Sequence, residues 1–352
     1  MRSYWLRIDR ALGRLRQRLE AATDVDEALL PLFRIFAGLH LLLSAPLSYQ
    51  WIAEAPQGFF RPPLSLAIYF TDFPSAAFFA VAEWLTVLCS FAILLGIKTR
   101  WAAYLLVITS VSALSFKYSF GKIDHGFLSH LTILLLAHTN WSTNLAILPD
   151  KPVSQSMGRT ALNLIGLSVC FGFFTAGFEK VFKWIDFDMS QGGFIAWWQM
   201  CYFTNDRTDL LAEYVPNLPV IVLESFDYIA VAFELSPLVF LSLGARCWRF
   251  WLLLAGCFHL GNTLFLNIPF QGMVLVYGVY VFPNFILKAH LYLQSTTIGR
   301  LNRWFKFSIL GIIGLLALMF DNTDSLYFAV CVWTAYIAAA VIAIMNFRKF
   351  TL

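Results

Sequence analysis

Charged residues are scarce in this chain of 352 residues. Asp, Glu, Lys and Arg together make up 13% of the sequence, whereas soluble domains carry about 25%. Hydrophobic residues make up 59%. A chain with so little charge cannot cover the surface of a soluble domain, so the composition predicts an integral membrane protein.

The sequence also lacks the motifs of common soluble enzymes and metal proteins. Its cysteines include no C-x-x-C pair and are not spaced like metal ligands. We therefore expect no disulfide framework, no thiol redox pair and no metal site. There is no phosphate-binding glycine loop, no G-x-S-x-G motif and no pair of catalytic carboxylates. The net charge of +4 reflects the loops of a membrane protein and does not indicate nucleic-acid binding.

Long apolar runs dominate the chain instead. A membrane-spanning helix needs about 20 mostly apolar residues, and no run shows the short alternation of a membrane β-barrel. The sequence therefore predicts an all-α, polytopic bundle of about ten transmembrane helices. The predicted spans are 28–48, 76–97, 101–119, 126–148, 160–182, 218–243, 248–267, 270–287, 305–321 and 327–346.

The distribution of basic residues predicts the orientation. Most of the 25 Lys and Arg residues fall at alternate junctions, beginning with the arginines that precede the first span and ending with Arg348 and Lys349. Because basic loops stay in the cytoplasm, we expect both termini to be cytoplasmic. Lys117, Lys122, Lys180 and Lys183 then belong to the outer junctions.

The chain is expected to have three regions. Residues 1–24 repeat apolar and arginine side chains at helical spacing, which predicts a basic amphipathic helix on the anionic cytoplasmic leaflet. A plain basic cap is the alternative. Residues 25–285 form the predicted membrane core, and residues 286–352 a cytoplasmic loop plus two C-terminal transmembrane helices.

Ionisable groups near the outer ends of three spans suggest a site. The predicted topology brings His125, Lys180 and His259 to the same depth, with His130 about a turn and a half below His125 and Asn262 one turn from His259. Ionisable residues in a membrane are costly and are functional candidates by default. The alternative for each histidine is a hydrogen-bonded packing group.

Lys180 has two interpretations. It can extend to the interface, as lysines at helix ends do. Alternatively, the small residues Gly172, Ala176 and Gly177 on the same side of the helix let a neighbouring helix approach, which turns Lys180 inward. Desolvation inside an apolar bundle disfavours the ammonium form and makes a neutral amine accessible.

Two further buried charges are expected to pair with each other. Arg34 lies in the first predicted span and Glu234 in the sixth, and both fall in the inner half of the membrane. We predict a structural ion pair between them, because charges inside a bundle need partners.

The segment 185–217, rich in aromatic residues, is interpreted as a lid beside Lys180 and Trp184, with an ordinary interfacial aromatic belt as the alternative.

Four stretches resemble one family. "AGFEKVFKW" resembles the A-G-x-x-K motif of vitamin K-dependent gamma-glutamyl carboxylase and of the related bacterial horizontally transferred transmembrane (HTTM) proteins. "DHGFLSHL" resembles the family's N-H-x-Y-L motif and "FHLGNTLF" its F-H-x-x-N stretch. "DEALLPLFRIFAGLHLL" is similar to the opening helix of HTTM proteins. The resemblance runs in order from about residue 25 to about residue 285.

The resemblance implies a quinol-dependent reaction. Lys180 would match the base that removes a proton from a reduced, vitamin K-like or menaquinol-like quinone, and His125 and His259 would match histidines of the same site. His130, Asn262 and Trp184 would line the quinone pocket. In the carboxylase, O2 converts the deprotonated quinol to a strong base, which deprotonates a glutamate γ-carbon so that CO2 adds.

The family context leaves the activity open. The chain has only two predicted spans after the motifs, where the carboxylase has a large extramembrane domain, and Glu179 replaces the basic residue beside the family's lysine. A quinol-dependent lyase or oxygenase would act on a secreted peptide or small substrate at the outer face of a bacterial inner membrane. The alternatives are a non-redox accessory protein for maturation or export of a secreted peptide toxin, and a scaffold. Membrane lipids are expected partners; the oligomeric state is open.

Overall fold

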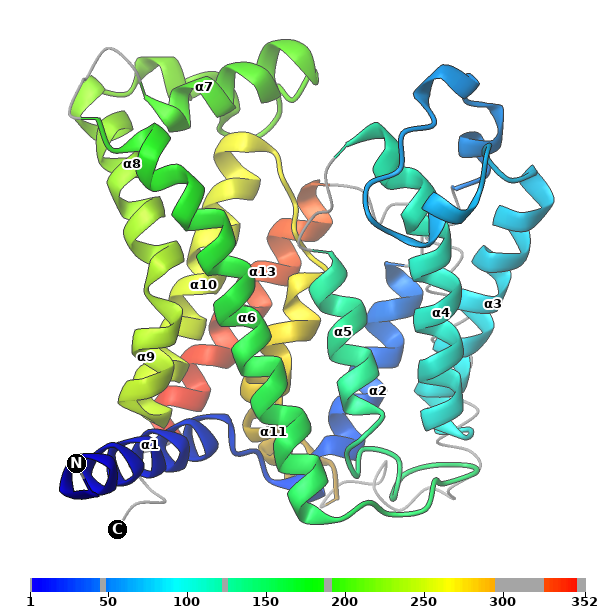
Figure 1. Cartoon of the computed structure of the whole chain (residues 1–352), viewed down its shortest axis with the longest axis vertical. Coiled ribbons are helices and arrows are strands. Elements are labelled where there is room, and N and C mark those ends of the chain that lie inside the picture. Colours follow the sequence, from blue (N-terminus) through cyan, green and yellow to red (C-terminus); the bar gives the residue numbers. More distant parts are fainter. Residues whose placement is uncertain (1, 45–48, 122–125, 187–191, 295–325, 347–352) are drawn as a thin grey trace. The chain divides into compact units, whose positions relative to one another are not determined.

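Helices dominate the residues that the structure describes. These are residues 2–44, 49–121, 126–186, 192–294 and 326–346 of a computed structural model (Figure 1). Among them there is no β-strand, only an isolated bridge between Ile97 and Leu148. The predicted all-α fold is confirmed for this part of the chain.

The helices form two compact units. The first unit comprises residues 1–24, 162–282 and 324–352, and the second comprises residues 25–161 and 283–323. One border between the units follows residue 24. The other borders, near residues 161 and 282, lie inside the predicted membrane core.

The second unit is built on α2 (Leu30–Leu43), α3 (Ala76–Leu95), α4 (Thr99–Lys117) and α5 (Phe127–Leu136). α3 packs against both α2 and α4. Close approach of α2 and α3 requires Gly38, because a Cβ at this position would lie 2.5 Å from the Cα of Leu94. α3 ends at Gly96, whose φ of 71° is a left-handed conformation that favours glycine.

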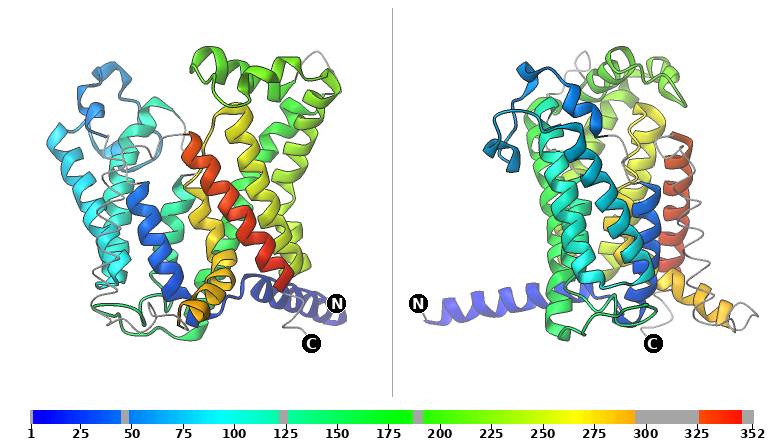
Figure 2. Two further views of the ribbon diagram at one scale, coloured as in Figure 1. Left: turned by 180° about the vertical axis from the view of Figure 1, so that it is seen from behind. Right: turned by 90° about the vertical axis from the view of Figure 1, so that its right-hand side faces the viewer.

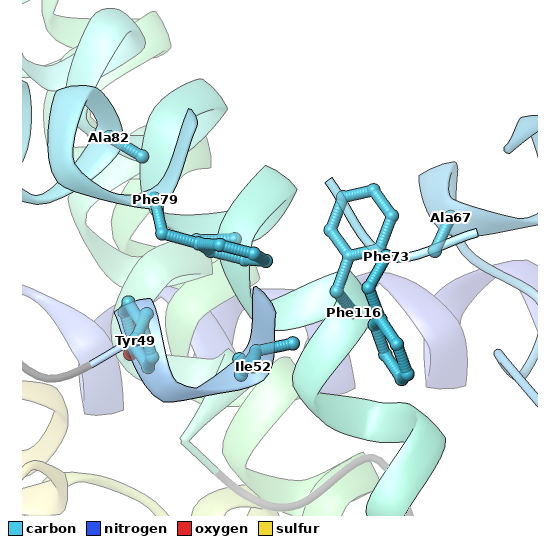
Figure 3. Close-up of a cluster of buried hydrophobic side chains, with 8 residues drawn as sticks. Tyr49, Ile52, Ala67, Phe73, Phe79, Ala82 and Phe116 are labelled. Atoms are coloured by element: carbon cyan, nitrogen blue, oxygen red, sulfur yellow. The ribbon is translucent and has the colours of Figure 1, made fainter. Parts of the chain in front are cut away.

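Short helical turns join α2 to α3 and cover a small aromatic core (Figure 3). Glu83 on α3 anchors this segment, because its buried carboxylate accepts hydrogen bonds from the backbone N–H of Tyr49 and from the side chain of Gln50. The turns are Gln50–Glu54, Gln57–Phe59 and Leu66–Tyr69. The buried core residues are Tyr49, Ile52, Ala67, Phe73, Phe79, Ala82, Ala113 and Phe116.

The first unit contains α1 (Arg2–Thr23), most of α6 (Gln155–Trp184), α7 (Gly193–Gln199), α8 (Val220–Leu235), α9 (Pro237–Leu243), α10 (Ala245–Leu266), the start of α11 (Met273–Gln294) and α13 (Leu326–Asn346). α10 packs against α13 and α9, and α1 lies across the ends of α9 and α10 (Figures 1 and 2). Leu12 and Leu15 on α1 are exposed.

The apolar helices match a membrane protein. Within the described residues, four helices are long and apolar enough to cross a membrane, and the pair α8 and α9, bent by 49°, makes a fifth if it is one span. The break follows Ser236, where Pro237 cannot donate to the helix ladder. The four helices are Ala76–Leu95, Thr99–Phe120, Gln155–Trp184 and Ala245–Leu266.

The predicted windows and the described helices differ most clearly at α5. The predicted span 126–148 is wrong in length, because α5 ends at Leu136. Polar residues follow, and their side chains form hydrogen bonds outside the helix. The Asn140 side chain donates to Glu27 and to the carbonyl of Val153. The predicted span 305–321 lies outside the described residues.

Candidate functional site

Lys180 and Glu234 form an ion pair between two helices of the first unit. The Nζ atom of Lys180, near the end of α6, lies 2.5 Å from Oε1 of Glu234 on α8. The Lys180 side chain is 23% exposed and that of Glu234 is 5% exposed. Gly177, one turn before Lys180, packs against Glu234, since a Cβ on Gly177 would lie 2.8 Å from its Cβ. The small-residue side of α6 therefore faces α8.

The predicted ion pair between Arg34 and Glu234 is wrong, because each residue has another partner. Glu234 bonds to Lys180, and Arg34 in the second unit donates from Nη2 to the carbonyl of Leu145. Arg34 is fully buried beside the turn at Gly96, where a Cβ would lie 1.7 Å from Nη1. The guanidinium of Arg34 thus fits closely against Gly96, and this is a tertiary contact.

Trp184 connects the ion pair to the next segment. The Lys180 Nζ lies over the indole ring, 4.6 Å from its centroid, which is the geometry of a cation–π contact. The same ring touches Gly193 at the start of α7, because a Cβ there would lie 2.2 Å from the ring Cγ. A side chain at position 193 would therefore displace the indole that supports Lys180.

Asp227 on α8 fixes the start of α7. Its carboxylate is fully buried and accepts hydrogen bonds from the backbone N–H of Gly193 at 2.8 Å and of Phe194 at 2.6 Å. Asp227 and Glu234 are seven residues apart, about two helical turns, and so lie on one face of α8. Through these two carboxylates α8 holds both the end of α6 and the start of α7.

An open cavity of about 450 Å³ lies between the end of α6 and α7. This volume is in the range of small-molecule sites, about 300–1,000 Å³, and two indoles with a few polar groups suit a flat apolar ligand. Lys180 does not line the cavity but contacts Trp184, which does. The lining residues are Lys183, Trp184, Asp186, Gly192, Gly193, Ala196, Trp197 and Met200.

His259 lies in a buried aromatic cluster and does not line this cavity. It is 4% exposed, and its Nε2 is 2.9 Å from the hydroxyl of Tyr277 on α11. Its ring also stacks on Trp333 of α13, with 4.8 Å between the ring centroids. The backbone carbonyl of Asn262 accepts a bond from the N–H of Ile268 and so helps to end α10. These contacts hold α10, α11 and α13 together.

Two further predicted site residues are His130 and His125. His130 on α5 belongs to the second unit, and its Nδ1 lies 3.2 Å from the carbonyl of Gly126. His125 falls outside the described residues. Of the residues predicted to share a site, Lys180 and Trp184 are in contact, and Glu234 joins them.

Two of the three acidic residues on α8, Glu224 and Asp227, were not predicted as site residues from the sequence. Glu224, Asp227 and Glu234 in "ESFDYIAVAFE" recur at spacings of three and seven, which places all three on one helix face. This spacing within an apolar helix was the available signal. Among the described residues, no three His, Cys, Asp or Glu side chains lie close enough to hold a metal ion.

Comparison of the whole chain with models of protein families finds no match. Comparisons with curated proteins and with solved structures also find none.

Proposed function

We propose that the chain is a multi-pass membrane protein of the HTTM type with about ten spans. Both termini would be cytoplasmic, and the end of α6 that carries Lys180 and the start of α8 would face outward, across a bacterial inner membrane. The alternation of basic junctions along the sequence supports this topology. The apolar helices of both units are consistent with it.

We propose further that the Lys180 site carries out quinol-linked chemistry on a secreted peptide or a small substrate. The single observation that supports this proposal is the Lys180–Glu234 ion pair, held between apolar helices and resting on Trp184. Intramembrane ionisable pairs commonly serve proton transfer. A reduced quinone, when bound, would supply an acidic hydroxyl whose deprotonation allows reaction with O2 and, in a carboxylase, addition of CO2.

The residues around the cavity suit a planar aromatic ligand. The indoles of Trp184 and Trp197 offer flat apolar faces, and Gly192 and Gly193 add no side chain to the lining of the cavity. Glu234 accepts a hydrogen bond from Lys180 and so fixes the position of the nitrogen to which we assign proton transfer. Trp184 fixes the position of Lys180, and α7 keeps water from one side of the cavity.

Mass spectrometry of copurified quinones tests the proposal. We expect a quinone to be enriched with the wild-type protein, and its amount or redox state to change in Lys180→Ala. Lys151→Ala is the matched control, because Lys151 is an exposed lysine in the second unit. If neither the wild type nor the control retains a quinone, even after addition of one in reduced form, the quinol-linked proposal fails.

Exposed side chains in the second unit favour one other function, that of an accessory protein for maturation or export of a secreted peptide. Leu64 is 87% exposed and Tyr69 is 82% exposed, on a segment that the proposed topology places outside. Such side chains suit contact with an apolar peptide. In this case Lys180→Ala would leave peptide maturation intact, whereas Leu64→Ser with Tyr69→Ser would abolish it.

A further inference from the structure

α8 buries more acidic side chains than the proposed chemistry uses. Glu224, Asp227 and Glu234 are 6%, 0% and 4% exposed, in a helix that is otherwise largely apolar. Glu234 pairs with Lys180, but Asp227 and Glu224 have no part in that pair. Buried carboxylates are costly unless they hold something in place or exchange protons.

The side chain of Asp227 holds α7 through hydrogen bonds from two backbone N–H groups. Both of its oxygens are engaged, one by the N–H of Gly193 and the other by the N–H of Phe194. Such charge-assisted bonds are about twice as strong as neutral ones. They press Gly193 against the ring of Trp184, which lines the cavity and supports Lys180. The charge on one carboxylate therefore sets the position of the cavity wall.

Two other carboxylates act on the charge of Asp227. Glu224 on α8 and Asp186, just after α6, both repel the carboxylate of Asp227. Oε1 of Glu224 is buried without a hydrogen-bond partner in the described part of the chain. Lys183 at the end of α6 lines the same cavity and is already paired with Glu179. α7, with the sequence GFIAWWQ, contributes no charged side chain.

We propose that Asp227 is a proton-sensitive clasp for α7 and a positioning residue for the Lys180 site. The charged carboxylate holds the start of α7 against Trp184 and over the cavity. Protonation of Asp227 removes the charge from both bonds, so the start of α7 detaches while Trp198 and Cys201 keep its other end packed. The cavity then opens from the outer side as the pH falls. That this opening admits a ligand rests on the proposed function.

Hydrogen–deuterium exchange of the protein in lipid nanodiscs measures the two N–H groups directly. We expect the amides of Gly193 and Phe194, corrected for intrinsic exchange, to be protected in the wild type at about pH 8 and to lose at least about tenfold of that protection near pH 5. Asp227→Asn should show the reduced protection at both pH values. Glu213→Gln, which alters an exposed carboxylate on the nearby turn Ala212–Asn217, should behave as the wild type.

Two results would overturn the clasp. One is unchanged protection of Gly193 and Phe194 in a folded Asp227→Asn protein, judged by normal protection of α8. The other is wild-type protection that is the same at both pH values, which decides the matter even if the variant does not fold. Exchange is measured without a quinone, so failure of the quinol-linked proposal would leave this result standing.

Discussion

Glu234 on α8 accepts a hydrogen bond from Lys180 on α6 over 2.5 Å, and both side chains are largely removed from solvent. Seven residues earlier, Asp227 on the same face of α8 accepts two backbone bonds from the start of α7. Trp184 lies between these two attachments, in contact with Lys180 and with Gly193. The candidate site is thus organised by one face of one helix.

The Lys180–Glu234 pair should matter more to stability than a second pair on the same helix. Glu234→Gln removes the charge that balances Lys180 and should cost about 2–3 kcal/mol, because the hydrogen bond to a charged group is buried. Glu179→Gln breaks the exposed pair with Lys183 and should cost less than about 1 kcal/mol. Thermal unfolding in detergent, with both variants side by side, measures the difference. Equal losses of stability in the two variants would show that the buried pair contributes no more to stability than the exposed pair.

A side chain at position 193 should displace Trp184. Gly193→Ala should destabilise the first unit by about 1–3 kcal/mol, because its Cβ would overlap the indole ring. Combining it with Trp184→Ala should cost less than the sum of the two single changes, since the overlap disappears. Gly261→Ala is the control, because nothing lies within 4 Å of a Cβ there. Additive effects of the two changes in thermal unfolding would contradict the contact.

The turns between α2 and α3 should depend on Glu83. Glu83→Gln removes the negative charge that the Tyr49 N–H and the Gln50 side chain bond to, and should cost about 1–2 kcal/mol locally. Limited proteolysis should then cut the segment 50–70 several times faster than in the wild type. Glu54→Gln, at an exposed carboxylate in the same segment, should leave the cleavage rate unchanged. Equal rates for all three proteins would rule out this anchor.

The proposed topology predicts opposite labelling of two introduced cysteines. In a chain without its native cysteines, Leu64→Cys should react with a membrane-impermeant maleimide added to intact cells. Lys151→Cys should react only after the membrane is permeabilised, because basic junctions stay in the cytoplasm. Both positions are exposed. Labelling of both from the same side would refute the alternation of junctions and the outward orientation of the Lys180 site.

Local sequence patterns were sufficient for the helices but not for all of their ends. Most of the predicted windows correspond to helices, since a long apolar run between polar junctions leaves the backbone few alternatives. The end of α5 was misplaced because the apolar content after Leu136 continues while Asn140 bonds to residues distant in the sequence. The bend at Ser236 could have been read from Pro237.

The sequence by itself determined the helical class and the apolar character, because composition and helical periodicity are local properties. Only the tertiary structure decided the partners. Arg34 and Glu234 looked complementary in sequence, yet Glu234 bonds to Lys180 and Arg34 fits beside Gly96. The choice depended on close approaches at Gly177, beside Glu234, and at Gly96, beside Arg34, and such contacts arise only when helices pack.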